Sequence, residues 1–363
     1  MESGRYRSRS VNAPRTLRYP AELVESGLVS AEKLPALEDV AARYAVAITP
    51  EIVGLIDPAD DADPIARQYV PDPAELRTTP DETGDPIGDK IHEVSEGLIH
   101  RYPDRVLLKF VHVCAVYCRF CFRREMVGPQ APHLTPQALE KALDYVRAHP
   151  EIWEVVVSGG DPLVASPRRI SELVQALADI DHVRVVRFHT RVPMVAPERV
   201  TDALVASLTA PGVTGWVAIH ANHPHEFTPA ARAAIARLAD AGIPLVSQTV
   251  LLAGINDDAE TLGQLMRTFV ENRVKPYYLH HGDLAPGTGH FRTSLAAGQD
   301  LMRALRGRIS GLCQPTYVLD IPGGHGKAPV GPTYVETTPE AVSVEDYRGG
   351  KHPYRPGEIR TES

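Results

Sequence analysis

Cysteine is scarce in this chain, and four cysteines in 363 residues are too few for a disulfide scaffold. No run approaches the roughly 18 apolar residues that a membrane-spanning helix needs, and the first 30 residues lack the apolar segment of a secretory signal. We therefore expect a cytoplasmic protein in a reducing compartment. Acidic residues outnumber basic ones by 46 to 38, for a formal charge of -8. Neither nucleic acid nor a membrane surface is therefore an expected partner.

The sequence does contain a regular alternation of strand-like and helix-like segments. Amphipathic helical patterns separate the apolar runs, and one of them starts at Thr135-Pro136, an N-cap residue followed by proline at the first helical position. Such alternation is typical of parallel β/α units. It predicts an α/β fold, a partial TIM-type (β/α)6 barrel. The strand-like runs are Val106–Val113, Glu154–Val157, Val183–Phe188, Gly215–Ile219, Leu245–Leu252 and Pro276–His280.

Three regions follow from this pattern. Residues 1–90 are expected to form an N-terminal arm and helical region, and residues 91–306 the (β/α)6 core. Residues 307–363 form a C-terminal segment, which holds one more strand candidate at Thr316–Leu319 and a glycine-rich loop. The tail 345–363 is polar and is expected to be disordered.

Three cysteines lie directly after the first predicted strand, where parallel barrels place their chemistry. Cys114, Cys118 and Cys121 have the spacing Cys-x3-Cys-x2-Cys. Three thiolates can hold three irons of a 4Fe–4S cluster and leave the fourth iron open to a substrate. Zinc, which usually takes four ligands, a Cys-x-x-Cys redox pair, and simple burial are the alternatives.

A second motif, Pro322-Gly-Gly-His-Gly-Lys327, ends in a lysine on a glycine-rich loop. It is not a phosphate-binding Walker loop, because Ala328 follows where serine or threonine would stand. A lysine on such a loop can form a Schiff base with an aldehyde cofactor such as pyridoxal phosphate. The alternative is a lysine in an ordinary surface turn.

The cysteine motif, Ser158-Gly159-Gly160-Asp161 after the second strand, and the lysine loop together resemble the lysine 2,3-aminomutase family. The resemblance runs from about residue 91 to residue 334 and places the chain in the radical S-adenosylmethionine superfamily. It implies an isomerase that uses a 4Fe–4S cluster, S-adenosylmethionine and pyridoxal phosphate. The cluster would be held by the three cysteines, and S-adenosylmethionine by Phe120, Ser158, Gly159, Gly160 and Asp161, where the family more often has glutamate than aspartate.

The same resemblance implies roles for six further residues. Lys327, Arg105 and Gln248 would bind pyridoxal phosphate. Arg123 would bind the α-carboxylate of the substrate, and Asp283 and Asp320 would hold the ε-ammonium of lysine. For Arg105 and Arg123 the alternative is a surface arginine, the latter as part of a solvated Arg123-Arg124 pair. For the two aspartates the alternative is a turn or a cap.

The implied reaction moves the 2-amino group of L-lysine to C3 and gives β-lysine. An acidic pair would not suit glutamate, but another basic amino acid could use it. A related branch of the family modifies lysine for attachment to a translation elongation factor. A non-catalytic iron–sulfur protein would explain the cysteines alone.

Further expectations concern metals and partners. The best-known relatives also hold zinc, but this chain has no cysteine after Cys313 and has Asp258 at another ligand position, so no zinc is expected. His220, His223 and His225 form either a metal motif or a set of polar residues at a strand end. We expect an amino acid substrate, a flavodoxin- or ferredoxin-type electron donor, and a homo-oligomer.

Overall fold

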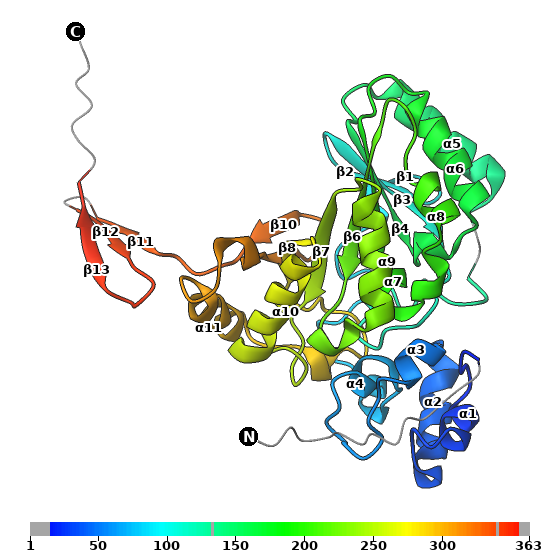
Figure 1. Cartoon of the computed structure of the whole chain (residues 1–363), viewed down its shortest axis with the longest axis horizontal. Helices are drawn as coiled ribbons and strands as arrows, with labels where there is room; N and C mark the ends of the chain where they lie inside the picture. The colour runs from blue at the N-terminus through cyan, green and yellow to red at the C-terminus, as the bar shows by residue number, and fades with distance from the viewer. Residues whose placement is uncertain (1–14, 132–133, 339–340, 356–363) are drawn as a thin grey trace.

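A single large sheet organises the computed structural model, which describes residues 15–131, 134–338 and 341–355. Within these residues the sheet has ten strands in sequence order, of which β3 to β9 are parallel (Figure 1). Strands β1, β2 and β10 pair antiparallel at the two edges. The strands are β1 (Glu93–Ser95), β2 (Leu98–Tyr102), β3 (Arg105–Val111), β4 (Glu154–Gly159), β5 (Val185–Thr190), β6 (Thr214–His220), β7 (Leu245–Val250), β8 (Lys275–His280), β9 (Thr316–Ile321) and β10 (Gly326–Pro329).

The partial barrel predicted from the sequence is confirmed. The six predicted runs correspond to β3 through β8, and the additional candidate at Thr316–Leu319 extends the parallel set as β9. The sheet order runs from β1 to β10 without a pairing between these two strands in the described part of the chain, so the barrel is open.

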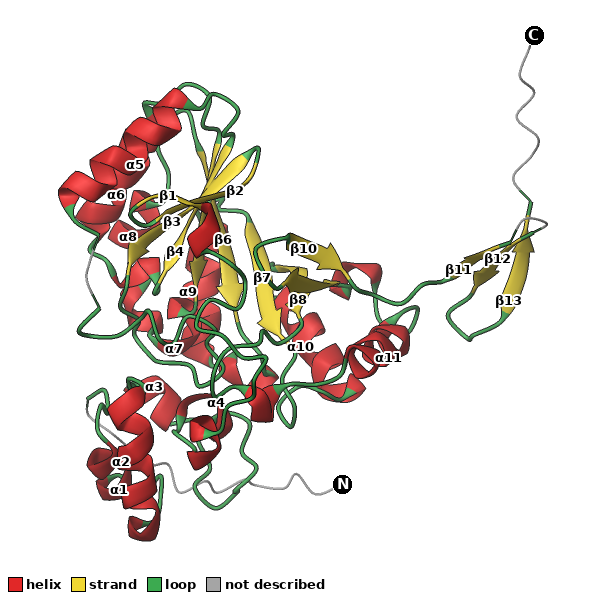
Figure 2. Ribbon diagram, turned by 180° about the vertical axis from the view of Figure 1, so that it is seen from behind, coloured by secondary structure: helices red, strands yellow, loops and turns green. Residues whose placement is uncertain are grey.

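Helices cover one side of the sheet (Figures 1 and 2). The Thr135 hydroxyl caps α5 by accepting from Ala138 N at 3.1 Å, as the sequence predicted. The apolar stripe that includes Ala142 and Val146 is buried against the sheet. Among the described residues no helix is long and apolar enough to cross a membrane. The helices of this layer are α5 (Pro136–Ala148), α6 (Pro167–Ala178), α7 (Val192–Val195), α8 (Asp202–Ser207), α9 (Pro229–Asp240), α10 (Ala259–Glu271) and α11 (Leu295–Leu305).

Between α7 and the end of α8 the chain does not form one continuous helix. A short 3-10 turn at Pro197–Arg199 precedes α8, and Ala196 has φ -153° and ψ 58°, outside the helical region. The Thr201 side chain then starts α8 anew by accepting from Leu204 N at 3.2 Å.

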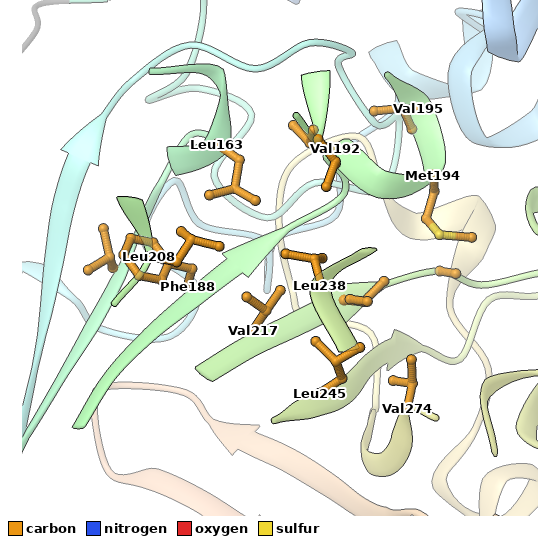
Figure 3. Packing of buried hydrophobic residues seen from close by; sticks show 14 of the residues in the cluster. Leu163, Phe188, Val192, Met194, Val195, Leu208, Val217, Leu238, Leu245 and Val274 are labelled. Atoms are coloured by element: carbon orange, nitrogen blue, oxygen red, sulfur yellow. The ribbon is translucent and has the colours of Figure 1, made fainter. Parts of the chain in front are cut away.

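The main hydrophobic core lies between the sheet and its helices. Figure 3 shows Phe188 of β5, Val217 of β6 and Leu245 of β7 gathered with Leu238 of α9. All four side chains are 5% exposed or less. Close packing of this kind fixes the strands relative to one another, and so fixes the positions of the residues that follow their carboxyl ends.

The N-terminal helical region docks on the core through buried ionic contacts. It consists of short helices, and its Glu75 is 0% exposed. The Glu75 carboxylate accepts hydrogen bonds from Arg119 and Arg124, both in the cysteine loop. The helices are α1 (Pro20–Glu25), α2 (Leu34–Arg43), α3 (Pro50–Val53) and α4 (Ala66–Tyr69), with 3-10 turns η1 (Ala31–Lys33), η2 (Pro73–Leu76) and η3 (Lys90–His92). The division of the chain at 90/91 and 306/307 remains a prediction.

A C-terminal arm stands apart from the sheet (Figures 1 and 2). Its strands β11 (Val335–Thr337), β12 (Val342–Glu345) and β13 (Lys351–Tyr354) form a separate antiparallel sheet. The expectation of disorder from residue 345 onward is therefore wrong for 345–355, while 356–363 lie outside the described residues. The physical reason is a tight turn, in which the Asp346 carboxylate accepts from the backbone N–H groups of Arg348 and Gly350.

Candidate active site

A cavity of about 740 Å³ opens at the carboxyl ends of the parallel strands and continues along the inner face of the sheet. Every residue predicted for the site lines this cavity, and together they come from five stretches of sequence between residues 105 and 327. These residues are Arg105, Cys114, Cys118, Phe120, Cys121, Arg123, Ser158, Gly159, Gly160, Asp161, Gln248, Asp283, Asp320 and Lys327.

The three cysteines form part of one wall of this cavity, and all three are free thiols. Burial raises the pKa of Cys121 to about 11, and burial together with Asp161 raises that of Cys114. These thiols are therefore protonated at neutral pH unless they coordinate a metal, which binds the thiolate form. Three soft sulfur donors on one cavity wall fit three irons of a 4Fe–4S cluster.

Arg191, at the end of β5, contacts the cysteine loop directly. Its Nη1 donates to Cys118 Sγ at 3.1 Å, and its Nη2 donates to Gln68 and to Glu226. Glu226 is 0% exposed and compensates the buried guanidinium. Sequence reasoning missed this contact, because the partners of Arg191 lie in three distant segments of the chain.

The Ser158-Gly-Gly-Asp segment requires its glycines. A Cβ on Gly159, whose φ is +108°, would lie 2.4 Å from Val111 O, and one on Gly160 would lie 2.3 Å from Val113 O. These close approaches bring the end of β4 against the chain just before Cys114.

The Asp161 carboxylate accepts three hydrogen bonds from within the protein. It accepts from Leu163 N at 3.0 Å, Thr190 Oγ1 at 2.7 Å and Arg191 N at 2.7 Å. It thereby ties the end of β4 to the end of β5. A direct contact between this side chain and S-adenosylmethionine remains a prediction.

Phe120 forms an apolar wall beside the cysteines. It packs with Leu252, Ile255 and Phe291, and its ring meets that of Phe291 edge-on at 6.2 Å between centroids. Such a surface suits the flat face of an adenine base.

Lys327 lies opposite Asp320 in the β9–β10 hairpin. Its Nζ donates to both Asp320 carboxylate oxygens at 2.6 Å, and its backbone N donates to the Tyr102 hydroxyl at 2.7 Å. Gly323, Gly324 and Gly326 reach positive φ values of 86° to 87° in the loop, a conformation that glycine adopts without strain. The Lys327 side chain is 30% exposed, lines the cavity, and belongs to strand β10 rather than to the turn itself.

Asp283 and Asp320, the two aspartates predicted to bind the substrate ammonium, have pKa values shifted in opposite directions. Burial, together with the charge of Asp320, raises the pKa of Asp283 to about 7. Burial alone would also raise the pKa of Asp320, but His280 and Lys327 outweigh it and hold that pKa below its usual range. The cavity therefore offers one permanent carboxylate and one that titrates near neutrality.

Arg123 and Arg124 are not a solvated pair, because they are only 7% and 6% exposed. They diverge: Arg124 reaches Glu75, whereas Arg123 Nε and Nη2 donate to Asp89 Oδ2 at 3.2 and 2.8 Å. Asp89 lies in a segment that the sequence marked only as part of the N-terminal region.

Arg105 and Gln248 both line the cavity. The Arg105 guanidinium stacks on the Tyr102 ring at 3.9 Å and pairs with Asp104 at 2.5 Å. Its side chain is 34% exposed, so it is a partly open cation at the cavity mouth. Contact of either residue with pyridoxal phosphate remains a prediction.

The histidine motif divides into two parts. His220 lines the cavity, with Nε2 3.1 Å from Asn222 Oδ1. His223 caps a 3-10 turn by accepting from His225 N at 3.2 Å. Asp258, which stands where the family resemblance would put a zinc ligand, caps α10 by accepting from Glu260 N and Thr261 N. These contacts favour a polar strand end over a metal motif.

Comparison with known proteins identifies the family. The model of the radical SAM superfamily matches residues 108–266, and that of lysine-2,3-aminomutase matches residues 302–359. The L-lysine 2,3-aminomutase of Clostridium subterminale is 42% identical over 84% of this chain and 73% of its own length. A putative L-lysine 2,3-aminomutase of Aquifex aeolicus is also 42% identical, over 81% and 79%. The glutamate 2,3-aminomutase of Clostridioides difficile is 36% identical over 82% and 70%.

These relatives share the chemistry but differ in the amino acid that their names give. The superfamily implies a 4Fe–4S cluster and S-adenosylmethionine, and the cysteine motif for the cluster is present. The chain therefore belongs to the lysine 2,3-aminomutase family of the radical S-adenosylmethionine superfamily, and is an aminomutase, an isomerase acting on an amino acid.

Proposed function

We propose that this aminomutase acts on L-lysine, moves the 2-amino group to C3, and carries pyridoxal phosphate on Lys327. One observation carries the choice of substrate: Asp283 and Asp320 lie in the cavity beside Lys327. Arg123, which suits a carboxylate, lines the same cavity. An amino acid with a carboxylate at one end and an ammonium at the other matches these charges.

The residues present fit pyridoxal phosphate. A lysine amine enters the cavity from a glycine loop, and the partly open Arg105 offers a cation for a phosphate. When bound, the cluster and S-adenosylmethionine supply a radical that takes a hydrogen atom, and pyridoxal phosphate delocalises the unpaired electron while nitrogen migrates.

The chain's own residues bind and orient the substrate. Asp320 holds the Lys327 ammonium in the absence of substrate. If Lys327 held the cofactor, its ammonium would no longer occupy Asp320, and the Asp320 carboxylate could pair with the distal ammonium of lysine. Asp283 completes this pocket, and its raised pKa falls when a cation arrives beside it. Burial of the groups strengthens each of these contacts.

The test is anaerobic incubation of reconstituted protein with S-adenosylmethionine, pyridoxal phosphate, a reductant and one amino acid at a time. Lysine, arginine, ornithine and glutamate are compared, and products are read by mass spectrometry after chiral derivatisation. β-Lysine from lysine alone is the expected result. A β-amino acid formed only from another substrate would keep the family chemistry and overturn the lysine assignment. 5′-Deoxyadenosine without any β-amino acid would point to a different lysine substrate, such as one destined for a protein.

We also propose a homo-oligomer and a flavodoxin- or ferredoxin-type reductant. The C-terminal arm supports the former. By strand register, one face of its sheet carries Thr337 and His352 and four apolar residues, Val335, Val342, Val344 and Tyr354; Val335 and Tyr354 are 48% and 58% exposed. An apolar face of a small sheet gains stability when it is covered. Sedimentation velocity measures the oligomeric state directly.

A further inference from the structure

Asp89 occupies one edge of the Arg123 guanidinium. A guanidinium presents two edges that can bind a carboxylate, Nε with Nη2 and Nη1 with Nη2. Asp89 Oδ2 takes the first edge, at 3.2 Å from Nε and 2.8 Å from Nη2. Among the described residues, the hydrogen bonds of this guanidinium go to Asp89 alone. The Nη1–Nη2 edge is therefore the one left to a ligand.

The Asp89 carboxylate is itself held firmly. It is 3% exposed, and its other oxygen accepts from Arg101 Nη2 at 2.9 Å. The same Arg101 nitrogen donates to Ile87 O at 2.8 Å. The buried Arg123 guanidinium, the Arg101 guanidinium, which is 10% exposed, and the buried Asp89 carboxylate carry a net charge of one positive, which matches a single carboxylate. Without Asp89, two uncompensated guanidinium groups would repel each other in a buried site.

The segment Ile87–His92, called the strap below, also contacts the glycine loop that carries Lys327. A Cβ on Gly88 would lie 2.3 Å from Gly324 N, so the two backbones touch. His92 Nε2 lies 2.8 Å from Gly324 O. Because Asp89 belongs to the strap, the position of Arg123 is tied to the position of the loop that ends in Lys327.

We propose that Asp89 is a positioning residue: it fixes the Arg123 guanidinium so that the Nη1–Nη2 edge faces the substrate carboxylate at a set distance from the Lys327 loop. The inference rests on the proposed function only in that Arg123 binds this carboxylate, a group that every α-amino acid carries. It does not depend on lysine being the substrate.

The test measures equilibrium binding rather than turnover. Lysine and lysinamide, which lacks the carboxylate, are titrated by calorimetry into anaerobic holoenzyme with S-adenosylmethionine and no reductant. Asp89→Asn keeps the size of the side chain but removes the charge. It is expected to weaken lysine binding about tenfold or more, the cost of a charge-assisted hydrogen bond. Lysinamide binding should change less than about twofold, because no carboxylate meets Arg123.

Three controls keep the result interpretable. Asp81→Asn changes an exposed aspartate of the same region and should match the wild type. In an Arg123→Gln background, Asp89→Asn should add little to the loss, because its effect passes through Arg123. If Asp89→Asn fails to take up the cluster, Asp89→Glu replaces it, because this variant keeps the negative charge and changes only the position of the carboxylate. Asp89→Glu should weaken the binding of lysine by less than Asp89→Asn does, and should leave the binding of lysinamide unchanged.

The outcomes separate this proposal from the substrate assignment. Equal weakening of lysine and lysinamide would show a general structural role and overturn the proposal, as would unchanged lysine binding. If wild type binds only arginine, ornithine or glutamate, the lysine assignment fails, and the Asp89 test is run with that amino acid and its amide. If wild type binds none of the four, both proposals fall.

Discussion

Lys327 and Asp320 face each other across the β9–β10 hairpin, with Nζ 2.6 Å from each carboxylate oxygen. The residue predicted to bind the cofactor is thus paired with a residue predicted to bind the substrate. Asp320 cannot hold both the Lys327 ammonium and a substrate ammonium with both oxygens at this distance. If Lys327 held pyridoxal phosphate, as proposed, Asp320 would be left to pair with a cationic group of the substrate.

Lys327→Ala should remove the visible absorbance of bound pyridoxal phosphate, because no other amine of the chain lines the cavity in its described part. The cluster should remain, since its cysteines lie on a different loop. Absorbance spectra and iron and sulfide content check both points. Lys351→Ala, which removes an exposed ion pair in the arm, is the control and should keep both cofactors. Covalently bound pyridoxal phosphate in Lys327→Ala would refute the assignment of this lysine.

Lysine binding should release a proton near neutral pH. Asp283 is about half protonated at pH 7 in the free protein, because burial raises its pKa to about 7. A bound ammonium favours the carboxylate, so lysine affinity should fall as the pH drops below about 7, by at most about tenfold per pH unit, and level off above it. Calorimetry in buffers of different ionisation enthalpy counts the proton.

The variant Asp283→Asn shows how much of the proton release comes from Asp283 and how much from other groups. The variant cannot titrate at this position, so proton release between pH 6 and 8 should decrease by the share that Asp283 contributes. Binding should also be weaker, because one carboxylate is lost from the pocket. The same proton release in wild type and variant would assign the titration to another group.

The local motifs could be predicted from the sequence, whereas their supporting ion pairs could not. The cysteine spacing and the glycine-loop lysine each lie within a few residues, so their chemistry is visible in the sequence. Asp89 meets Arg123 34 residues away, and Glu75 meets Arg119 44 residues away. Such contacts depend on how the N-terminal region docks, and periodicity carries no information about it.

The strand prediction succeeded for a related reason. A strand that is buried on both faces consists mostly of consecutive apolar residues. The strands β4 and β5 can therefore be recognised in the sequence. The arm strand β13, Lys351–Tyr354, is exposed and polar, and its pairing with β12 is set by a turn at Asp346. Composition alone therefore indicated disorder where a strand exists.

Glu75→Gln should destabilise the protein strongly. It removes the charge that compensates two buried guanidinium groups, those of Arg119 and Arg124. Breaking one partner of a buried ion network typically costs about 3–5 kcal/mol of unfolding free energy. Urea unfolding of the apoprotein, followed by circular dichroism, measures the loss. Glu38→Gln, on the exposed face of α2, should change it by less than about 0.5 kcal/mol. A Glu75→Gln variant as stable as Glu38→Gln would mean that the N-terminal region does not rely on this contact.

Gly160→Ala should impair S-adenosylmethionine binding without removing the cysteines. The added Cβ would lie 2.3 Å from Val113 O, a backbone atom that cannot swing aside. The end of β4 must then move away from the residue that precedes Cys114, which displaces two walls of the same cavity relative to each other. A displacement of about 1 Å can lower a reaction rate about 100-fold.

The rate of reductive cleavage of S-adenosylmethionine by Gly160→Ala should fall by a factor of that order, and the equilibrium binding of S-adenosylmethionine should weaken. Gly311→Ala, where a Cβ meets nothing within 4 Å, should behave as the wild type. Normal S-adenosylmethionine binding by Gly160→Ala would show that the contact between β4 and the cysteine loop can relax. Gly160 would then affect only the local backbone and not the binding site.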